Sequence, residues 1–375
     1  MESFKGNHSG SMSSLPRPGA IEAPRPRVAS TRANLRGRKK KAAFICDGVD
    51  FLHDRHAVVD WVFGGGRRGK IEALTDCHPA VVTSEQMSAV ATELEQVEVV
   101  FSTWGMPCLT SGQLEMLPKL RAVFFAGGSV RSIARPLLER KVVLASAWVA
   151  NAVPVAEFTV GQILLSNKGY FRNSREYRDP GAYVSSYCGR GNFEETVALL
   201  GAGQIGRKVI EMLQAFHLRV LVFDPFLSEA EAGKLGVEKV SLVEAFEHGM
   251  IVSNHLADVP ATAGLLNGAL FQRMRDGATF INTGRGATVV EADLIRVMQM
   301  RPDLTALLDV TNPEPPISGS LLYTLPNIRL SAHIAGSKGH EVVRMADYMI
   351  DEFKRWELGK QLQYQVTLSM LHTMA

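Results

Sequence analysis

The stretch VALLGAGQIG, residues 197–206, decides the fold of this chain. Its four apolar residues are typical of a buried strand and lead directly into the pattern G-x-G-x-x-G. A second apolar run, RVLVF at 219–223, follows and ends on Asp224. A strand, a glycine-rich turn, a helix and a second strand that ends in an acid are, in this order, the parts of a dinucleotide-binding unit. The stretch therefore predicts a parallel α/β sheet that binds a dinucleotide.

The glycines of this motif have separate physical roles. Gly201 permits the tight turn after the strand, Gly203 lets the backbone approach a pyrophosphate, and Gly206 allows the helix to pack closely on the strand. The helix that begins near Gln204 directs its free N–H groups, including that of Ile205, toward the phosphates. We expect all five residues to contact the cofactor.

Asp224 predicts which dinucleotide is bound. Its carboxylate is placed to accept hydrogen bonds from both ribose hydroxyls, and it would repel a phosphate on the same ribose. No arginine follows in the sequence DPFLSE, residues 224–229. We therefore expect NAD rather than NADP.

The composition is that of a soluble globular protein, with 46% hydrophobic and 21% charged residues. A chain of 375 residues is too long for one compact core and fits two domains, which leave a cleft between them. No uninterrupted apolar run has the length of a membrane span. The four cysteines are widely separated and form no C-x-x-C pair, so we expect neither a disulfide framework nor a metal site. We expect a cytoplasmic protein with no membrane partner.

The first 41 residues form a basic tail, with ten Lys or Arg residues against two acids and so a balance of +8. They are rich in Ser, Pro, Gly and Arg and lack apolar periodicity, which predicts disorder. A nucleic-acid or membrane-surface role and an organellar transit peptide are open alternatives, but a solvated extension is favoured. We expect no nucleic-acid partner.

Beyond the tail, strands and helices alternate, which predicts parallel sheets. A first set of strands is expected at 42–46, near 73, and at 97–101, 122–125 and 142–144. A helix over 154–177 then crosses to a second set at 197–200, 219–223, 250–253, 278–282, 305–308 and 328–332. A last helix over 339–356 returns to the first domain. We expect a dinucleotide domain, 151–335, inserted into a smaller flavodoxin-like substrate domain made of 42–150 and 336–368, with 369–375 as a short tail.

Three polar side chains follow strands of the second set. The strand ATFIN, residues 278–282, leads into Thr283, Gly284 and Arg285, and the strand before Asp309 leads on to Glu314. The last strand ends at His333, in the sequence HIAG. Because ligands bind at the carboxyl ends of open parallel sheets, we expect Arg285, Glu314 and His333 to lie together at one edge.

These motifs resemble those of the D-isomer-specific 2-hydroxyacid dehydrogenases, which read N-x-x-R-G, D-V-x-x-x-E-P and H-I-x-G. The resemblance covers residues 42 to about 365. It implies an NAD-dependent oxidoreductase that acts on the CH–OH group of its donor and forms a homodimer through the dinucleotide domain, with 170–187 as a possible arm. It also implies that a further set of residues contacts the cofactor: Thr283 and Arg285 beside the nicotinamide, Asp309 at its carboxamide, His255 near the adenosine half, and also Gly284, Ala335 and Gly336.

The catalytic roles can be argued from the side chains themselves. The forked guanidinium of Arg285 can bind a carboxylate and polarise the adjacent carbonyl. His333 can give a proton to a ketone oxygen and take it back, and Glu314 can orient the imidazole and favour its protonated form. We expect hydride transfer between NAD(H) and a 2-hydroxy or 2-keto acid, as in glyoxylate, hydroxypyruvate or phosphoglycerate oxidoreductases.

Substrate recognition is expected from the first domain. Gly128 and Ser129, in AGGSVR at 126–131, are placed to offer backbone N–H groups to the substrate carboxylate, and Trp104 to form an apolar wall. Related sequences have an acid where Arg131 stands. Arg131 either reaches a second anionic group of the substrate or pairs with an acid on the surface, and the second is favoured.

A different class of function is also open. Corepressors that resemble this family keep the Arg-Glu-His set and use NAD(H) mainly to assemble, so the same residues fit an NAD(H)-sensing scaffold.

Overall fold

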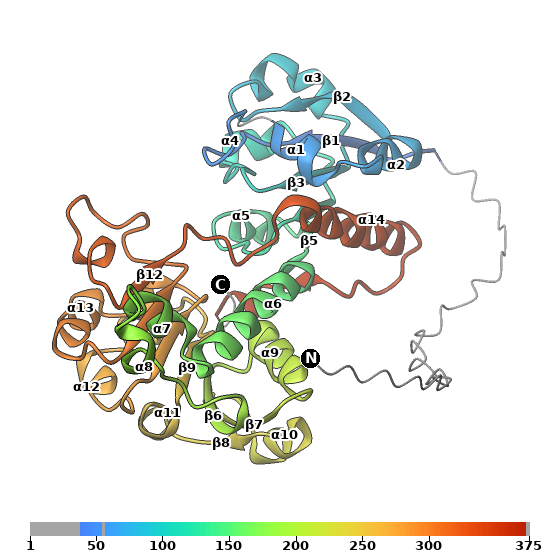
Figure 1. Ribbon diagram of the computed structural model, residues 1–375. Helices are drawn as coiled ribbons and strands as arrows, with labels where there is room; N and C mark the ends of the chain where they lie inside the picture. Colours follow the sequence, from blue (N-terminus) through green and yellow to red (C-terminus); the bar gives the residue numbers. More distant parts are fainter. Residues whose placement is uncertain (1–37, 55–56, 373–375) are drawn as a thin grey trace, which may run out of the picture. The chain divides into compact units, whose positions relative to one another are not determined.

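The computed structural model describes residues 38–54 and 57–372. They form two sheets of mostly parallel strands with helices between the strands (Figure 1). The predicted α/β class with two parallel sheets is confirmed. The predicted disorder concerns 1–41, and of these 1–37 lie outside the described residues. The first strand, β1, begins at Lys41, one residue before the domain boundary that we expected.

The first sheet has the strand order β13-β5-β4-β3-β1-β2. Its strands are β1 (Lys41–Ile45), β2 (Asp76–Val82), β3 (Val99–Thr103), β4 (Ala122–Ala126), β5 (Val143–Ser146) and β13 (Gln365–Val366). Strands β1 to β5 pair in parallel, whereas β13 joins β5 antiparallel when the chain returns. The expected strand near Ala73 is wrong, because Ala73 lies in a helix and β2 starts at Asp76. Strand β2 is at the sheet edge and largely exposed, so it has little apolar signal.

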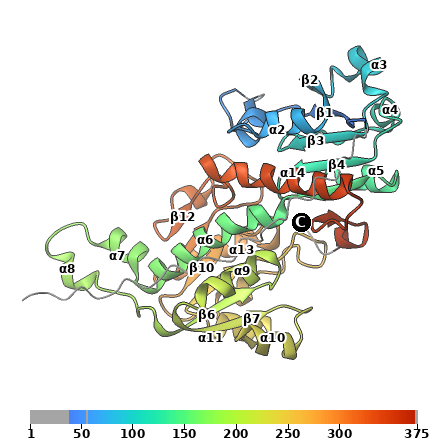
Figure 2. The same ribbon diagram turned by 90° about the vertical axis from the view of Figure 1, so that its right-hand side faces the viewer.

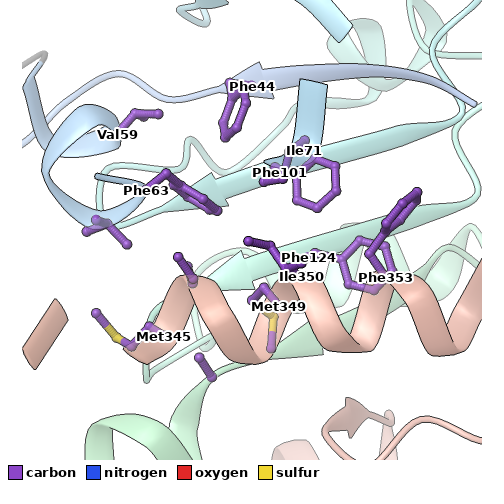
Figure 3. Packing of buried hydrophobic residues seen from close by; sticks show 14 of the residues in the cluster. Phe44, Val59, Phe63, Ile71, Phe101, Phe124, Met345, Met349, Ile350 and Phe353 are labelled. Carbon is purple, nitrogen blue, oxygen red and sulfur yellow. The ribbon is translucent and has the colours of Figure 1, made fainter. Parts of the chain in front are cut away.

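Helices cover both faces of this sheet, since its buried residues divide into two clusters with alternate strand residues in each. They are α1 (Val58–Val62), α2 (Arg67–Leu74), α3 (Ala91–Leu94), α4 (Ser111–Glu115), α5 (Ala134–Glu139) and the returning α14 (Val343–Glu357). The ring of Phe353 on α14 packs edge-on against Phe101 and Phe124, with centroids 5.4 and 5.6 Å away (Figure 3). Buried aromatic pairs of this kind contribute about 1 kcal/mol each beyond their area. The C-terminal helix is therefore part of the first domain's core.

The second sheet contains only parallel pairs, in the order β12-β11-β10-β9-β6-β7-β8. Its strands are β6 (Phe193–Leu200), β7 (His217–Phe223), β8 (Glu238–Lys239), β9 (Ile251–Asn254), β10 (Thr279–Asn282), β11 (Thr305–Leu308) and β12 (Ile328–Leu330). Its helices are α9 (Gln204–Leu213), α10 (Glu229–Leu235), α11 (Leu242–His248), α12 (Gly268–Phe271) and α13 (Glu291–Met300). All six predicted strands are present. The seventh, β8, has two residues and no buried side chain, so it leaves no apolar run.

One long helix, α6 (Trp148–Asn167), connects the two sheets. The predicted single helix over 154–177 is wrong in both bounds, because α6 begins at Trp148 and ends before Gly169, whose φ of +69° breaks it. Two short helices, α7 (Tyr170–Glu176) and α8 (Ala182–Ser185), follow beyond the end of α6 (Figure 2). We refer to residues 168–191 as the arm.

Helix α6 is long and apolar enough to cross a membrane by length and composition, with a mean hydropathy of 1.3. We expected no membrane span because the sequence has no uninterrupted apolar run of this length. Asn151 and Glu157 interrupt the run, but the mean hydropathy of the helix stays high in spite of them. However, 44% of the window is buried inside the protein, and α6 packs against α9 and α14. Core helices of soluble proteins pass the same test, so this property carries no membrane assignment.

Candidate active site

The glycine-rich loop between β6 and α9 has the geometry that a dinucleotide requires. Gly201 has a φ of +102°, and a Cβ there would lie 2.8 Å from the carbonyl oxygen of His255. A Cβ on Gly206 would lie 2.1 Å from the oxygen of Gly201, so helix and strand touch through the backbone. A Cβ on Gly203, in contrast, would have no atom within 4 Å other than those of its chain neighbours. The first and third glycines are needed for packing, and the second leaves space for a ligand.

Helix α9 begins at Gln204, directly after this loop. Its N-cap is Gly203, which has no side chain to cap the helix. The N–H groups of the first turn, which include Gln204 and Ile205, thus remain available to an anion. The loop and the helix fit the pyrophosphate of a dinucleotide.

Asp224 follows β7 next to the same loop. Its carboxylate accepts hydrogen bonds from the backbone N–H of Ala202 at 2.7 Å and of Phe226 at 2.7 Å. The acid therefore links the end of β7 to the glycine-rich loop. Each oxygen retains acceptor capacity for a hydroxyl group.

His333 and Glu314 form a direct pair, with 2.6 Å between His333 Nδ1 and Glu314 Oε1. The two side chains are 51% and 41% exposed, so the imidazole is accessible. Because Nδ1 is engaged by the carboxylate, Nε2 is the ring atom left to exchange a proton with a substrate. The structure brings these two predicted residues together.

The backbone of His333 is held in an unusual conformation, with a φ of +51°. Hydrogen bonds to Asp309 stabilise this backbone conformation. The carbonyl of Asp309 accepts the His333 N–H at 3.0 Å, and its carboxylate accepts the N–H groups of Ile334 at 2.8 Å and Ala335 at 2.9 Å and the Ser331 hydroxyl at 2.6 Å. Asp309 was expected at the nicotinamide carboxamide. In this structure its 3% exposed side chain anchors the loop that carries the imidazole, and the expected contact with the carboxamide stays a prediction.

Arg285 follows β10, and a buried network fixes its backbone. Its carbonyl oxygen accepts hydrogen bonds from Asn282 Nδ2 at 3.3 Å and Thr288 Oγ1 at 2.8 Å. Asn282 Oδ1 in turn accepts the N–H of Gly284 at 3.1 Å and Asn254 Nδ2 at 3.0 Å. These amide side chains come from the ends of two neighbouring strands, β9 and β10. The sequence analysis gave these two residues no role of their own, although Asn282 is the first residue of the N-x-x-R-G motif.

Among the described residues, the guanidinium of Arg285 donates a hydrogen bond to one group, the carbonyl of the neighbouring Gly284, at 2.8 Å. Burial lowers the pKa of this guanidinium, and the charges of Asp258 and Glu314 oppose the effect. An arginine remains charged under such conditions. A poorly hydrated cation close to an acid–base pair is suited to bind a carboxylate.

The other predicted residues of the second domain lie beside this site. Thr283 is buried, and its hydroxyl bonds that of Thr159 on α6 at 3.0 Å. Ala335 and Gly336 continue the His333 loop. His255 directly follows β9 and is 9% exposed. Its Nε2 lies 3.0 Å from Ser253 Oγ, while its Nδ1 has no partner within the described residues. Burial lowers the pKa of His255 to about 4, so this histidine is neutral at physiological pH.

The loop after β4 offers free N–H groups. Ser146 Oγ donates to the carbonyls of Gly127 at 2.8 Å and Gly128 at 3.0 Å. Within the part of the chain that the structure describes, the N–H groups of Gly128 and Ser129 donate no hydrogen bond. Two adjacent free N–H groups on a tethered loop can bind a carboxylate.

Trp104 lies at the carboxyl end of β3 within an aromatic group. Its ring centroid is 6.2 Å from that of Phe51 and 6.0 Å from that of Trp61, and Phe51 is 67% exposed. Trp104 is partly exposed and also packs against the core of the first domain.

Arg131 is paired with an acid of the second domain. Its Nη1 donates both to the carboxylate and to the carbonyl oxygen of Asp258, the latter at 3.0 Å. Of the two expected roles for Arg131, the structure has the ion pair with an acid.

Asn151, in the first turn of α6, connects two of these loops, and the sequence reasoning missed it. Its Oδ1 accepts the N–H of Ser337 at 3.1 Å. A Cβ on Gly128 would lie 3.1 Å from Asn151 Nδ2, and one on Gly336 would lie 3.4 Å from Oδ1. The side chain therefore lies between the loop after β4 and the loop that carries His333. The only sequence signal was a polar residue in an apolar helix.

Comparison with known proteins agrees with this geometry. Residues 160–335 match the D-isomer specific 2-hydroxyacid dehydrogenase, NAD binding domain. These residues are thus similar to the NAD-binding domain of that family. The glycine-rich loop, the start of α9 and Asp224 lie within them and fit NAD.

The chain is also similar to curated relatives and solved structures. It is 28% identical over 255 residues to D-3-phosphoglycerate dehydrogenase of Rattus norvegicus, covering 68% of this chain and 48% of the relative. It is 29% identical to the protein of the same name from Mycobacterium bovis, covering 60% and 42%. The chain thus spans about half the length of these relatives. The structure of D-mandelate dehydrogenase from Rhodotorula graminis matches with a TM-score of 0.72 and 20% identity, over 88% of this chain and 97% of that one, which shows a shared fold.

Proposed function

We propose that this protein transfers hydride between NAD(H) and the α-carbon of a 2-hydroxy or 2-keto acid, like the family that its NAD-binding domain resembles. The observation that carries the proposal is the 2.6 Å contact between His333 and Glu314, on the sheet edge that also holds Arg285 and the dinucleotide loop. A guanidinium and an oriented imidazole beside a dinucleotide site suit the reduction of a carbonyl next to a carboxylate.

The bound nicotinamide supplies or accepts the hydride. For reduction, Arg285 binds the substrate carboxylate together with the free N–H groups of Gly128 and Ser129, and it polarises the keto oxygen. His333 donates a proton from Nε2 to that oxygen as the carbon gains hydride, so the ketone becomes an alcohol. Glu314 holds the imidazole by Nδ1. In oxidation the same proton returns to His333.

The substrate is a small 2-keto acid such as glyoxylate, hydroxypyruvate or its 3-phosphate. The relatives named above support the last of these, since their name is D-3-phosphoglycerate dehydrogenase. The aromatic group around Trp104 supports a modest apolar contact with the substrate tail. Arg131 is occupied by Asp258, so it is not part of this proposal.

A screen of NADH oxidation tests the proposal. The full-length protein is mixed with NADH and, in separate reactions, glyoxylate, hydroxypyruvate, 3-phosphohydroxypyruvate, pyruvate and bulkier 2-keto acids. We expect turnover of at least one of them at 1 s⁻¹ or faster, on the order of ordinary enzymes. If none is reduced while NADH still binds, the NAD(H)-sensing scaffold is the better description.

We also propose a homodimer in the cytoplasm. The arm presents several exposed large side chains, which a partner copy can cover: Tyr170, Tyr177, Tyr183, Val184 and Tyr187. The four cysteines are all unpaired, as is usual for proteins of a reducing compartment. Light scattering tests the dimer. Replacing Tyr183 and Val184 with Ser should halve the measured mass, and an unchanged mass would show that the arm is not the interface.

A further inference from the structure

A cavity with both polar and apolar lining residues lies at the edge of the second sheet opposite the candidate active site. Its volume is about 340 Å³, which is within the range of small-molecule sites. Strands β10 and β11 begin in its wall, with Thr279 and Thr305 as their first residues. Arg285 and His333, in contrast, follow the ends of strands. The base of the arm forms another wall of the cavity. The polar and charged lining residues used in the argument below are Ser166, Arg172, Arg190, Asp276, Thr279 and Thr305.

The lining contains three buried residues with hydroxyl groups, and the hydroxyl of one of them, Ser166, has no hydrogen-bond partner in the described part of the chain. Ser166, Thr279 and Thr305 are 7%, 4% and 6% exposed. Ser166 Oγ has no hydrogen-bond partner within the described residues, and the same holds for both amide atoms of the adjacent Asn167. An unsatisfied buried polar group costs about 1–3 kcal/mol, so such groups generally have a ligand or water as partner.

The charges around the cavity favour an anion. Arg172 donates to Glu176 only through Nε, at 2.9 Å, and Arg190 lies 3.8 Å from Glu195. Each guanidinium therefore keeps terminal N–H groups that bond nothing else in the described part of the chain. The acid in the lining, Asp276, is held by Arg301 at 2.8 Å.

The arm lines the cavity with its base, where its two ends pack closely against each other. A Cβ on Gly169 would lie 2.7 Å from the carbonyl carbon of Cys188, and one on Gly189 would lie 2.3 Å from that of Lys168. The two ends of the arm thus touch backbone to backbone. The N–H of Arg190 also donates to the carbonyl of Asn167, at 2.8 Å. These contacts hold the wall that carries Arg172 and Arg190 against the end of α6, as a preformed site requires.

We propose that this cavity binds a small oxyanion, a carboxylate or a phosphate, at a site separate from the active site. The two guanidinium groups bind the anion, and the Ser166 hydroxyl, with those of Thr279 and Thr305, completes its coordination. A bound anion ties the arm to the first residues of β10 and β11. This inference does not depend on the proposed enzymatic function.

Calorimetric titration of the full-length protein tests the site. NADH is kept saturating so that the dinucleotide loop is filled, and sodium phosphate or sodium malonate is titrated at constant ionic strength set with chloride. We expect saturable binding of at least one of the two anions, and the comparison identifies which group is preferred. Ser166→Ala and Arg190→Gln should each weaken that binding at least tenfold.

Two further variants distinguish this site from other anion sites. Arg178→Gln changes an arginine of the arm that does not line the cavity, so binding should be the same as in the wild type. Arg285→Gln alters the active site and should leave this binding within a factor of two. The proposal is overturned if neither anion binds saturably, if Arg190→Gln binds as well as the wild type, or if Arg285→Gln abolishes the signal.

Discussion

The chemistry of this protein depends on how single residues are held. His333 adopts a left-handed backbone conformation that non-glycine residues rarely adopt, and three hydrogen bonds from the loop 333–335 to Asp309 stabilise it. Glu314 then fixes the ring through Nδ1. The imidazole is exposed at its reactive end and constrained everywhere else, which is the arrangement that proton transfer requires.

Arg285→Gln should impair both substrate binding and catalysis. Glutamine cannot form a bidentate, charged contact with a carboxylate, and it polarises a carbonyl weakly. We expect KM to rise and kcat to fall, with a decrease in kcat/KM of about 10³-fold. Steady-state kinetics of NADH oxidation provides the measurement. The matched control is Arg296→Gln, an exposed arginine on α13 that should keep wild-type values.

Asp224→Ala should weaken NAD binding and reduce the discrimination against NADP. The carboxylate that would bind the ribose hydroxyls is lost, and the N–H of Ala202 in the glycine-rich loop loses its acceptor. We expect the Kd for NADH to rise about tenfold or more, while the Kd for NADPH changes less. Fluorescence titration measures both, with Glu229→Ala as the control. A proportional change in both Kd values would argue against a role in selecting the ribose.

At the level of elements, prediction succeeded where the chain is buried and regular. The six parallel strands of the second sheet are continuous apolar runs, and Arg285, Glu314 and His333 could be located from the strands that precede them. Strands β8 and β13 were missed because each has only two residues, too few for an apolar run. They are strands because they pair with a neighbouring strand. Asn151 was missed because its hydrogen bond joins it to Ser337, which is distant in sequence. Asn282 was given no role of its own, although it opens the N-x-x-R-G motif and its side chain bonds the carbonyl of Arg285.

Glu352 connects the returning helix to the first sheet. Its carboxylate is buried, with Glu352 1% exposed, and Oε2 accepts the N–H groups of Gln363 at 2.9 Å and Tyr364 at 3.0 Å, just before β13. Glu352→Ala would leave these two N–H groups without an acceptor. We expect the free energy of unfolding to fall by about 3 kcal/mol, measured by urea denaturation. Glu357→Ala, an exposed acid on the same helix, should change it by less than about 0.5 kcal/mol.

At the scale of the molecule, the candidate site draws residues from both sheets. The carboxylate-binding loop belongs to the first sheet, and the imidazole and guanidinium belong to the second. Hydrogen bonds from Arg131 to Asp258 and from Ser337 to Asn151 connect these parts directly. We infer that closure of the substrate site depends on these contacts as well as on the residues that touch the substrate.

The stability of the whole molecule should depend on pH through His255. Its pKa is lowered to about 4 in the folded state from 6.5, so the unfolded chain binds the proton first as the pH falls. Stability is therefore lost between pH 6.5 and about 4 and is fully present above 6.5. The loss attributable to this histidine is about 3 kcal/mol.

His255→Gln should reduce this loss of stability with acid, as measured by denaturation between pH 7 and pH 4.5. His340→Gln replaces an exposed histidine and should show the same pH dependence as the wild type. Equal pH dependence in His255→Gln and the wild type would contradict burial of a neutral imidazole.

The central claim is that His333 exchanges the substrate proton while another part of the site holds the cofactor. The most direct test is His333→Ala, with single-turnover NADH oxidation and the Kd for NADH measured on the same preparation. We predict that the rate with the best 2-keto acid falls about 10³-fold, while the Kd for NADH stays within a factor of three. A rate close to that of the wild type, with NADH still bound, would contradict the account.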